Sequence, residues 1–248
     1  MRLPETILAI AAFLAVCSCS EKTAEVVPSM SFEISDISSS GCVIGVTLAD
    51  GAENYSMVVL PASSYTEAAA LDTLLASPSM TAASRVIERL HGTKDFVVAA
   101  MPFSGSGVHG EMTAREFTLT DFDLDLKLYT PQDGDESSLN RYNTIRIDAY
   151  SNGLPESGSY ALALTDAFRL LSAQKGRDAA IREILTENSE TLSRQKLEEM
   201  ADRTPYKSDL FYITGLSAGT SYTLVMSLTD LDGGEHLFSF EGSTKARE

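Results

Sequence analysis

The chain has 248 residues and carries 35 acidic against 19 basic side chains, which gives a formal net charge of −16 at pH 7. This excess of acid argues against a nucleic-acid partner and against electrostatic docking on anionic lipid, because both are negatively charged. The 3 histidines are scattered, and neither a His-x-x-x-His nor a Cys-x-x-Cys pair occurs, so we expect no metal site and no cofactor.

The amino terminus predicts export. Residues 7–16 form an apolar run of roughly half the length that a helix needs to cross a bilayer, which is typical of a signal peptide. The following Val16-Cys17-Ser18-Cys19 resembles a bacterial lipobox. We therefore predict a signal peptide over residues 1–18 and a lipidated tether over residues 19–29, with the lipid on Cys19. An ordinary secretory signal with two incidental cysteines is the alternative.

The polar sequence around the predicted cleavage point also suggests a location. The run Cys17-Ser-Cys-Ser-Glu-Lys22 is similar to the start of lipoproteins from Bacteroidales-type bacteria. That resemblance implies an outer-membrane protein held by a lipid anchor and exposed at the cell surface. The membrane, reached through the lipid, would then be its first partner.

The apolar pattern of residues 30–120 predicts a first β-domain with one helical block. Alternating or continuous apolar residues predict strands at 32–34, 42–48, 55–60, 96–101 and 115–119. Cys42 begins one of these runs, and we expect it to be a small buried side chain. Helical spacing begins near residue 65. Ser77-Pro78 resembles an N-cap followed by proline in the first turn, so a second helix is expected to carry the block to about residue 90.

Residues 121–248 repeat this order. Strands are expected at 122–128, 145–149, 160–164, 210–213, 222–228 and 237–240, and helices over about 166–203. Gly176 is expected to end the first of these helices. The same succession in both halves favours an internal duplication.

One short motif connects both halves to a known family. Leu216-Ser-Ala-Gly-Thr-Ser-Tyr222 resembles the Leu-x-Pro-x-Thr-x-Tyr signature of fibronectin type III domains, with Ala218 in the proline position. In the first half Leu90 and Phe96 have the same spacing, although Phe96 has no hydroxyl group. The resemblance implies a mainly β protein of two tandem fibronectin-III/Ig-like sandwiches, each with a helical insertion before the E and F strands.

Motifs for catalysis are weak. Ser172-Ala-Gln-Lys175 matches Ser-x-x-Lys of serine acyl enzymes but lacks their accompanying motifs. Asp121, Asp123 and Asp125 alternate with apolar residues, as on the solvated face of a strand. The acids of residues 230–235 are better explained by turn formation than by calcium binding. We therefore predict no catalytic residues and no enzymatic activity.

Candidate ligand-binding residues are few. Sugar-binding sites usually present flat aromatic faces, and the chain has no tryptophan. Most of its other aromatic residues fit strand patterns. Tyr129, Tyr142 and Tyr206 lie near turns, and they are the aromatic residues that we nominate for a protein or glycan ligand face.

Three functions remain open. The first is a non-enzymatic binding or spacer module on the outer membrane, whose helical insertions would expose an apolar patch if they present the binding surface. The second is a structural subunit of a surface assembly, such as a pilus anchor or tip, which needs an open sheet edge or an exchanged strand. The third is a glycan-processing hydrolase, which needs a cleft with two close carboxylates or a serine–base pair. The oligomeric state is left open.

Overall fold

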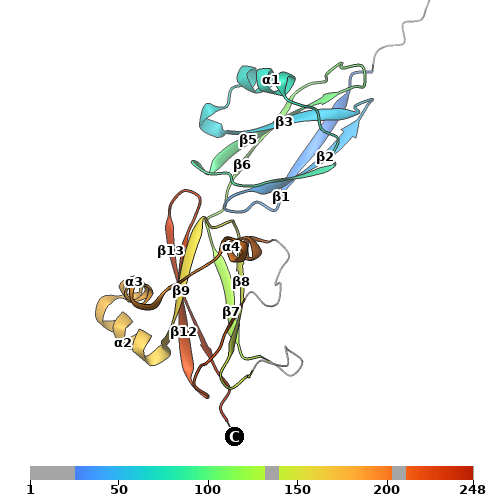
Figure 1. Cartoon of the computed structure of the whole chain (residues 1–248). Coiled ribbons are helices and arrows are strands. Elements are labelled where there is room, and N and C mark those ends of the chain that lie inside the picture. Colours follow the sequence, from blue (N-terminus) through green and yellow to red (C-terminus); the bar gives the residue numbers. More distant parts are fainter. Residues whose placement is uncertain (1–25, 132–139, 203–210, 248) are drawn as a thin grey trace, which may run out of the picture.

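The computed structural model describes residues 26–131, 140–202 and 211–247. They form two β-sandwiches placed end to end (Figure 1). We call them domain 1 and domain 2, and they meet at Thr120 and Asp121. The expected mainly β architecture of tandem sandwiches with helical insertions is confirmed.

Domain 1 consists of two three-stranded sheets. One sheet has the order β1 (Ser29–Ser35), β2 (Cys42–Ala49) and β4 (Ser84–Ile87). The other has the order β3 (Asn54–Pro61), β5 (Asp95–Phe103) and β6 (Thr113–Thr118). Alternate residues of the strands meet between the sheets, because successive side chains of a strand point to opposite faces. Phe32, Cys42, Ile44 and Val98 are among the buried residues of this core, and the predicted burial of Cys42 is confirmed.

Domain 2 repeats the strand order of domain 1. Its first sheet has the order β7 (Leu124–Tyr129), β8 (Ile145–Ser151) and β11 (Phe211–Ile213). Its second sheet has the order β10 (Glu190–Thr191), β9 (Ser157–Leu164), β12 (Ser221–Thr229) and β13 (Glu235–Ser243). Apart from the short β10, every strand of domain 2 has a counterpart at the same place in domain 1. The shared topology supports the duplication that the sequence suggests.

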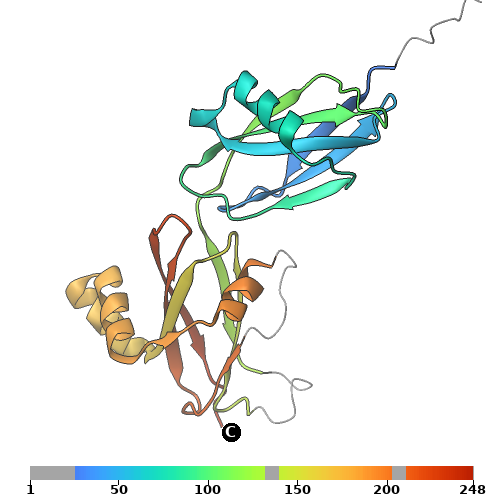
Figure 2. The same ribbon diagram turned by 45° about the horizontal axis from the view of Figure 1, so that its top comes forward.

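Both insertions follow the third strand of their sandwich, but they pack differently (Figures 1 and 2). In domain 1 the short η1 (Ala62–Ser64) and α1 (Glu67–Ala76) follow β3, and α1 packs outside the β3–β5 sheet. In domain 2 α2 (Thr165–Lys175) and α3 (Arg177–Asn188) cover the outer face of β9 and β12. The third helix, α4 (Arg194–Ala201), inserts Leu197 and Met200 into the core between the two sheets. Gly176 ends α2 with a φ of 87°, as predicted.

The second helix expected near residues 77–90 is wrong. Ser77 is the C-cap of α1: its amide donates to the Leu74 carbonyl at 3.3 Å and its hydroxyl to the Thr73 carbonyl at 2.7 Å. Proline is also common directly after a helix end, so Ser77-Pro78 marks a stop and not a start. Val86 and Ile87, which fit the apolar face of that expected helix, instead lie in β4, where Ile87 pairs with Cys42 of β2.

The insertions of domain 2 are held on the sandwich by a row of arginines. Arg169 binds Glu241 at 2.7 Å, Arg182 binds Glu235 at 2.7 Å, and Arg177 donates to the Ser239 hydroxyl at 3.1 Å. All three partners lie on β13. Since the apolar faces of α1, α2 and α3 pack on the sheets, the idea that the insertions form a display surface is weakened.

The E–F corner that carries the family resemblance differs between the domains. In domain 2 the Tyr222 hydroxyl accepts a hydrogen bond of 2.9 Å from the Ser217 amide, and Leu216 packs against the core. In domain 1 Phe96 has no hydroxyl group, and its ring stacks on Phe117 with 5.8 Å between centroids. None of the helices in the described ranges has the length and apolarity of a membrane span.

Candidate functional site: the junction between the two sandwiches

The covalent link between the domains is very short. Leu119 is 4% exposed in the core of domain 1, and Phe122 packs against the core of domain 2. Only Thr120 and Asp121 lie between them. The Thr120 amide donates to the Ser38 carbonyl at 3.1 Å, and the Asp121 carboxylate forms an ion pair with Lys94 of domain 1. Both linking residues are therefore bonded to domain 1.

Loops of the two domains also bond directly to each other. The Ser39 amide donates to the Asn152 carbonyl at 3.0 Å, and the Leu154 amide donates to the Ser40 hydroxyl at 3.1 Å. Gly153 lies between these bonds, and a Cβ placed on it would come within 2.0 Å of the Ser39 hydroxyl oxygen. The loops approach this closely because residue 153 is glycine.

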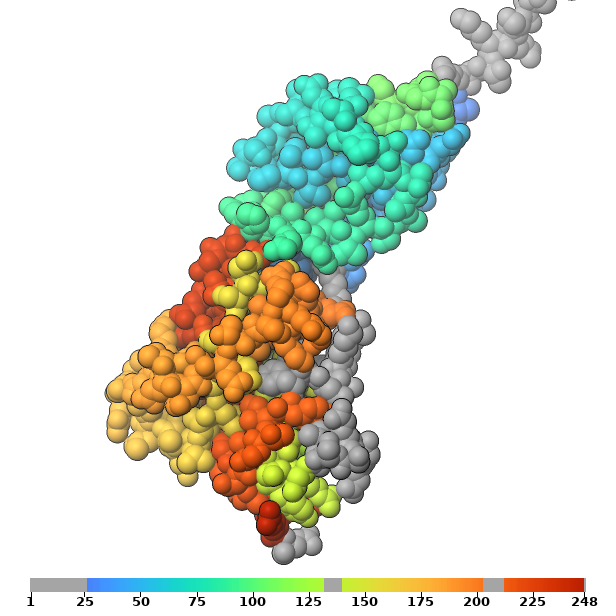
Figure 3. Space-filling model, viewed as in Figure 1, coloured from blue at the N-terminus to red at the C-terminus, as the bar shows by residue number. Residues whose placement is uncertain are grey.

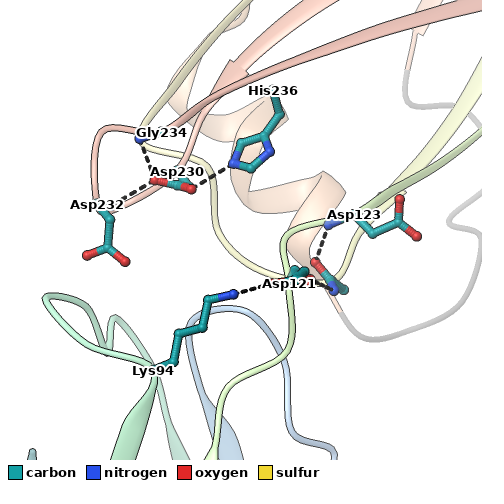
Figure 4. Close-up of polar contacts among 8 residues, drawn as sticks. Lys94, Asp121, Asp123, Asp230, Asp232, Gly234 and His236 are labelled. Atoms are coloured by element: carbon teal, nitrogen blue, oxygen red, sulfur yellow. Dashed lines mark hydrogen bonds and ion pairs between the residues drawn. The ribbon is translucent and has the colours of Figure 1, made fainter.

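The β12–β13 turn makes the third contact (Figure 4). Asp230 accepts hydrogen bonds from the amides of Asp232 and Gly234 at 2.9 and 2.8 Å, and its Oδ2 lies 2.7 Å from His236 Nε2. The turn chemistry predicted for residues 230–235 is thus confirmed. Asp232 in turn accepts a hydrogen bond from the amide of Gly92 in domain 1.

Electrostatics support this turn. Burial raises the pKa of Asp230, but the hydrogen bonds from His236 and from the two backbone amides outweigh it and hold this pKa below its ordinary value. The His236 ring packs on Phe122 of the link with 4.6 Å between centroids. The turn is therefore held by hydrogen bonds within itself and by the contact of His236 with Phe122, which follows the two linking residues.

The Lys94–Asp121 pair is exposed to solvent. The Asp121 carboxylate raises the pKa of Lys94, and the ammonium lowers the pKa of Asp121. Because both side chains are exposed, water and salt screen the pair. Asp121 and Asp123 lie before β7, which begins at Leu124, so their predicted place on a strand is wrong, whereas Asp125 lies on β7 and is exposed, as predicted.

A cleft of about 480 Å³ opens beside these contacts, and we call it the junction cleft. Val86, Glu88 and Arg89 line it from domain 1, and Tyr150, Leu154 and the Arg194–Ala201 helix α4 line it from domain 2. In Figure 3 the teal surface of domain 1 lies directly above the orange surface of α4. Clefts at domain interfaces are favoured places for ligands.

Arg89 stands out within this lining. Its backbone φ is 62°, in the left-handed region that residues other than glycine rarely adopt. Its guanidinium lies 3.7 Å from Glu156 of domain 2, and both side chains are 57% exposed. A strained residue at a domain boundary is a common feature of functional regions.

The aromatic residues predicted for a ligand face lie elsewhere. The Tyr129 hydroxyl donates to Asp148, and the Arg146 guanidinium lies 4.8 Å from the ring centroid. The Arg141 guanidinium lies 5.5 Å from the Tyr142 ring centroid. Tyr206, like the predicted lipidation site Cys19, lies outside the described residues. Each of the two described tyrosines thus already packs against an arginine of the protein, and the ligand face stays a prediction.

The arrangement gives no support to the catalytic motif. Lys175 forms an ion pair with Glu183 at 2.5 Å, and in the described residues the buried Ser172 hydroxyl has no hydrogen-bond partner that could act as a base. Within the described ranges, no group of three or more His, Cys, Asp or Glu side chains is arranged to hold a metal ion.

Comparison with known proteins establishes no relative of this chain. No protein-family model and no curated protein matches this sequence. Among solved structures, a two-domain fibronectin type III segment of chicken tenascin aligns at 11% identity over 88% of this chain and 99% of that chain, with a TM-score of 0.30. A central fibronectin-III array of RIM-binding protein aligns at 11% identity over 90% of this chain and 71% of that chain, with a TM-score of 0.28. Scores this low establish no relationship, and the sandwich architecture rests on the strand pairings of the chain itself.

Proposed function

We propose that the protein is a lipid-anchored, non-enzymatic spacer module of the outer membrane, whose two sandwiches act as one stiff rod. The tether at the amino terminus holds the rod, and domain 2 is carried away from the membrane. Binding of a partner, where it occurs, takes place at the rod and not at a flexible linker.

The observation that carries this proposal is the bonded junction. Two residues separate the cores, both are bonded to domain 1, and two loops of domain 1, the β1–β2 loop and the β4–β5 loop, contact domain 2. Domains of one chain move relative to one another by default unless their interface restrains them. Here, rotation between the domains would break several hydrogen bonds at once.

The positions of the chain ends suit a spacer. β1 begins at the end of domain 1 that is remote from domain 2, and the carboxyl terminus lies at the opposite end of the molecule (Figures 1 and 2). A tether before β1 would therefore place domain 2 outermost. The net charge of −16 keeps such a rod from adhering to anionic surfaces.

Lipid attachment is tested by comparing Cys19→Ser with Cys17→Ser in the native host. A clickable fatty-acid label and membrane fractionation provide the readouts. We expect Cys19→Ser to lose both label and membrane association, and Cys17→Ser to keep both. Labelling that persists in Cys19→Ser would contradict the anchor.

Display is tested separately by adding protease to intact cells. If the rod faces outward, domain 2 is cleaved without lysis, whereas a periplasmic control protein stays intact. Protection of domain 2 until lysis would place the rod on the inner side of the membrane.

The alternative of a structural assembly subunit has less support. Among the described residues β4 does leave one sheet edge open, but each sandwich is completed by strands of its own chain, so neither needs a strand donated by another molecule. Light scattering after gel filtration distinguishes the two functions: we expect a monomer, and concentration-dependent polymers would favour the alternative.

A further inference from the structure

We propose that the junction cleft binds an extended peptide, which adds as a strand to the open edge of β4. This proposal goes beyond the spacer function and does not depend on the lipid anchor. It rests on the backbone geometry of β4, on the exposure of Val86 and on the wall that α4 provides.

The register of β4 shows which backbone groups are available. The Val46 amide donates to the Ala83 carbonyl at 2.8 Å, and Val46 lies opposite Ala83. Opposite residues of antiparallel strands alternate between hydrogen-bonded and non-hydrogen-bonded pairs. Arg85 and Ile87 therefore bond to β2, while the N–H and C=O groups of Ser84 and Val86 point to the other side.

That other side is an open edge. In the part of the chain that the structure describes, β4 is the outer strand of its sheet and pairs with β2 alone. Unpaired backbone groups on an outer strand are a template for one more strand, and the chemistry that satisfies them is an extended polypeptide.

Side chains beside this edge also provide surface that a bound peptide would contact. Val86 is 54% exposed and also lines the junction cleft, so the edge leads directly into the cleft. On the opposite wall, Arg194, Glu198 and Ala201 lie on one face of α4 and line the same cleft. A peptide on β4 would thus be held between a strand and a helix.

The lining also indicates the character of the peptide. Val86, Tyr150, Leu154 and Ala201 offer apolar surface for at least one apolar side chain. The charged lining residues are three acids, Glu88, Glu198 and Asp202, and two arginines, Arg89 and Arg194. With a net charge of −16 on the whole chain, long-range attraction favours a neutral or basic peptide over an acidic one.

The test selects peptides and then removes the edge. The full chain, purified in detergent, is used to select from a display library of random short linear peptides, and the enriched sequence is synthesised as the probe. Val86→Pro removes the outward N–H and places a ring at the edge; proline is tolerated on outer strands where the N–H faces solvent. Val86→Thr is the matched control, because it keeps both the N–H and the strand propensity.

We expect the probe to bind the wild-type chain and Val86→Thr with similar affinity and to lose at least about tenfold with Val86→Pro. Two N-methylated versions of the probe are made, one methylated at the odd-numbered amides and one at the even-numbered amides. Only the version whose methylated amides face β4 should lose binding. Hydrogen exchange of the Ser84 and Val86 amides should slow on binding, while Arg85 and Ile87 are protected already without the probe.

Three results would each overturn the proposal. The first is a selection that enriches no peptide on the wild-type chain beyond what it enriches on Val86→Pro. The second is equal affinity of the probe for wild type and Val86→Pro. The third is a probe that still binds whichever of its two alternate sets of amides is N-methylated. If Val86→Pro fails to fold, judged by its thermal transition, the N-methylated probes decide the outcome with the wild-type chain alone.

Discussion

The two sandwiches share one strand order but differ at their fourth strand. In domain 1 this strand is β4, whose outer edge is open beside the junction cleft. In domain 2 the described residues of this strand are β11, which pairs with Ile145–Ile147, and α4 contacts β8 and β9. The strand pairing is the same in both domains, whereas the insertions differ: α1 packs outside a sheet and α4 packs between the sheets.

The largest expected effect concerns the role of the insertions. Leu197 of α4 is 2% exposed between the sheets, whereas Leu74 of α1 is buried outside a sheet. Leu197→Ala and Leu74→Ala should each cost about 2–5 kcal/mol, because both leave a cavity. Hydrogen exchange should show loss of protection across both sheets of domain 2 for Leu197→Ala, but loss near α1 for Leu74→Ala.

A matched control is Leu170→Ala on α2, since Leu170 is 63% exposed. It should change stability by less than about 0.5 kcal/mol. If Leu197→Ala behaves like this control, α4 is not part of the core and the comparison between the domains fails.

The E–F corners give a smaller difference. Tyr222→Phe makes domain 2 resemble domain 1 and leaves the Ser217 amide without its partner. We expect a loss of about 1 kcal/mol in urea unfolding. Tyr142→Phe serves as a control for removing a hydroxyl group; a loss as large as that of Tyr222→Phe would show that the corner bond is not the cause.

Acid should weaken the β12–β13 turn, which has no counterpart carrying the same acid–histidine pair in domain 1. The pKa of Asp230 is lowered from 3.8 in the folded protein, so its stabilising effect is complete above the unfolded value and is lost as pH falls through the folded one. Asp230→Asn should therefore be less stable than wild type at pH 7, by about 1 kcal/mol, and the difference should shrink in acid. The exposed Asp72→Asn on α1 is the control. A difference that stays constant with pH would exclude the charge as the cause.

The smallest effect is expected for the arginines that hold the helices of domain 2. Arg182 and Glu235 are 57% and 43% exposed. Arg182→Gln should cost about 0.5 kcal/mol, and less at high salt, because salt screens exposed pairs. A salt-independent loss would point to packing instead of charge.

Much of the strand frame was predictable from the sequence, because the signal is local. The alternation at Phe32, Cys42 and Ile44 places side chains on a buried face without any knowledge of distant partners. The helix expected near residue 85 failed because Val86 and Ile87 fit a helical face as well as a strand. Pairing with β2, which is more than 40 residues earlier in the chain, decides between them.

The candidate site was not predictable in the same way. The junction cleft combines the loop at Ser38, the end of β4, the loop at Asn152 and helix α4. These segments meet only because the domains dock, and no local pattern records that contact. The local pattern nearest to the domain boundary is Phe122 between Asp121 and Asp123, and this pattern fits the start of a strand as well as a link between domains.

Gly153 offers a way to break the junction without touching either core. Val at this position would insert a side chain where a Cβ already comes within 2.0 Å of the Ser39 hydroxyl oxygen. Gly45→Val is the matched control, because nothing lies within 4 Å of a Cβ at Gly45. We expect Gly153→Val to separate the domains, with each sandwich still folded by circular dichroism.

The most direct test of a stiff rod is the residual dipolar couplings of the backbone amides, measured on the non-lipidated Cys19→Ser chain. One alignment tensor should fit the amides of both sandwiches, and Gly153→Val should require two tensors of different magnitude. Two different tensors in the chain that keeps Gly153 would show that the domains move independently, and would contradict the account.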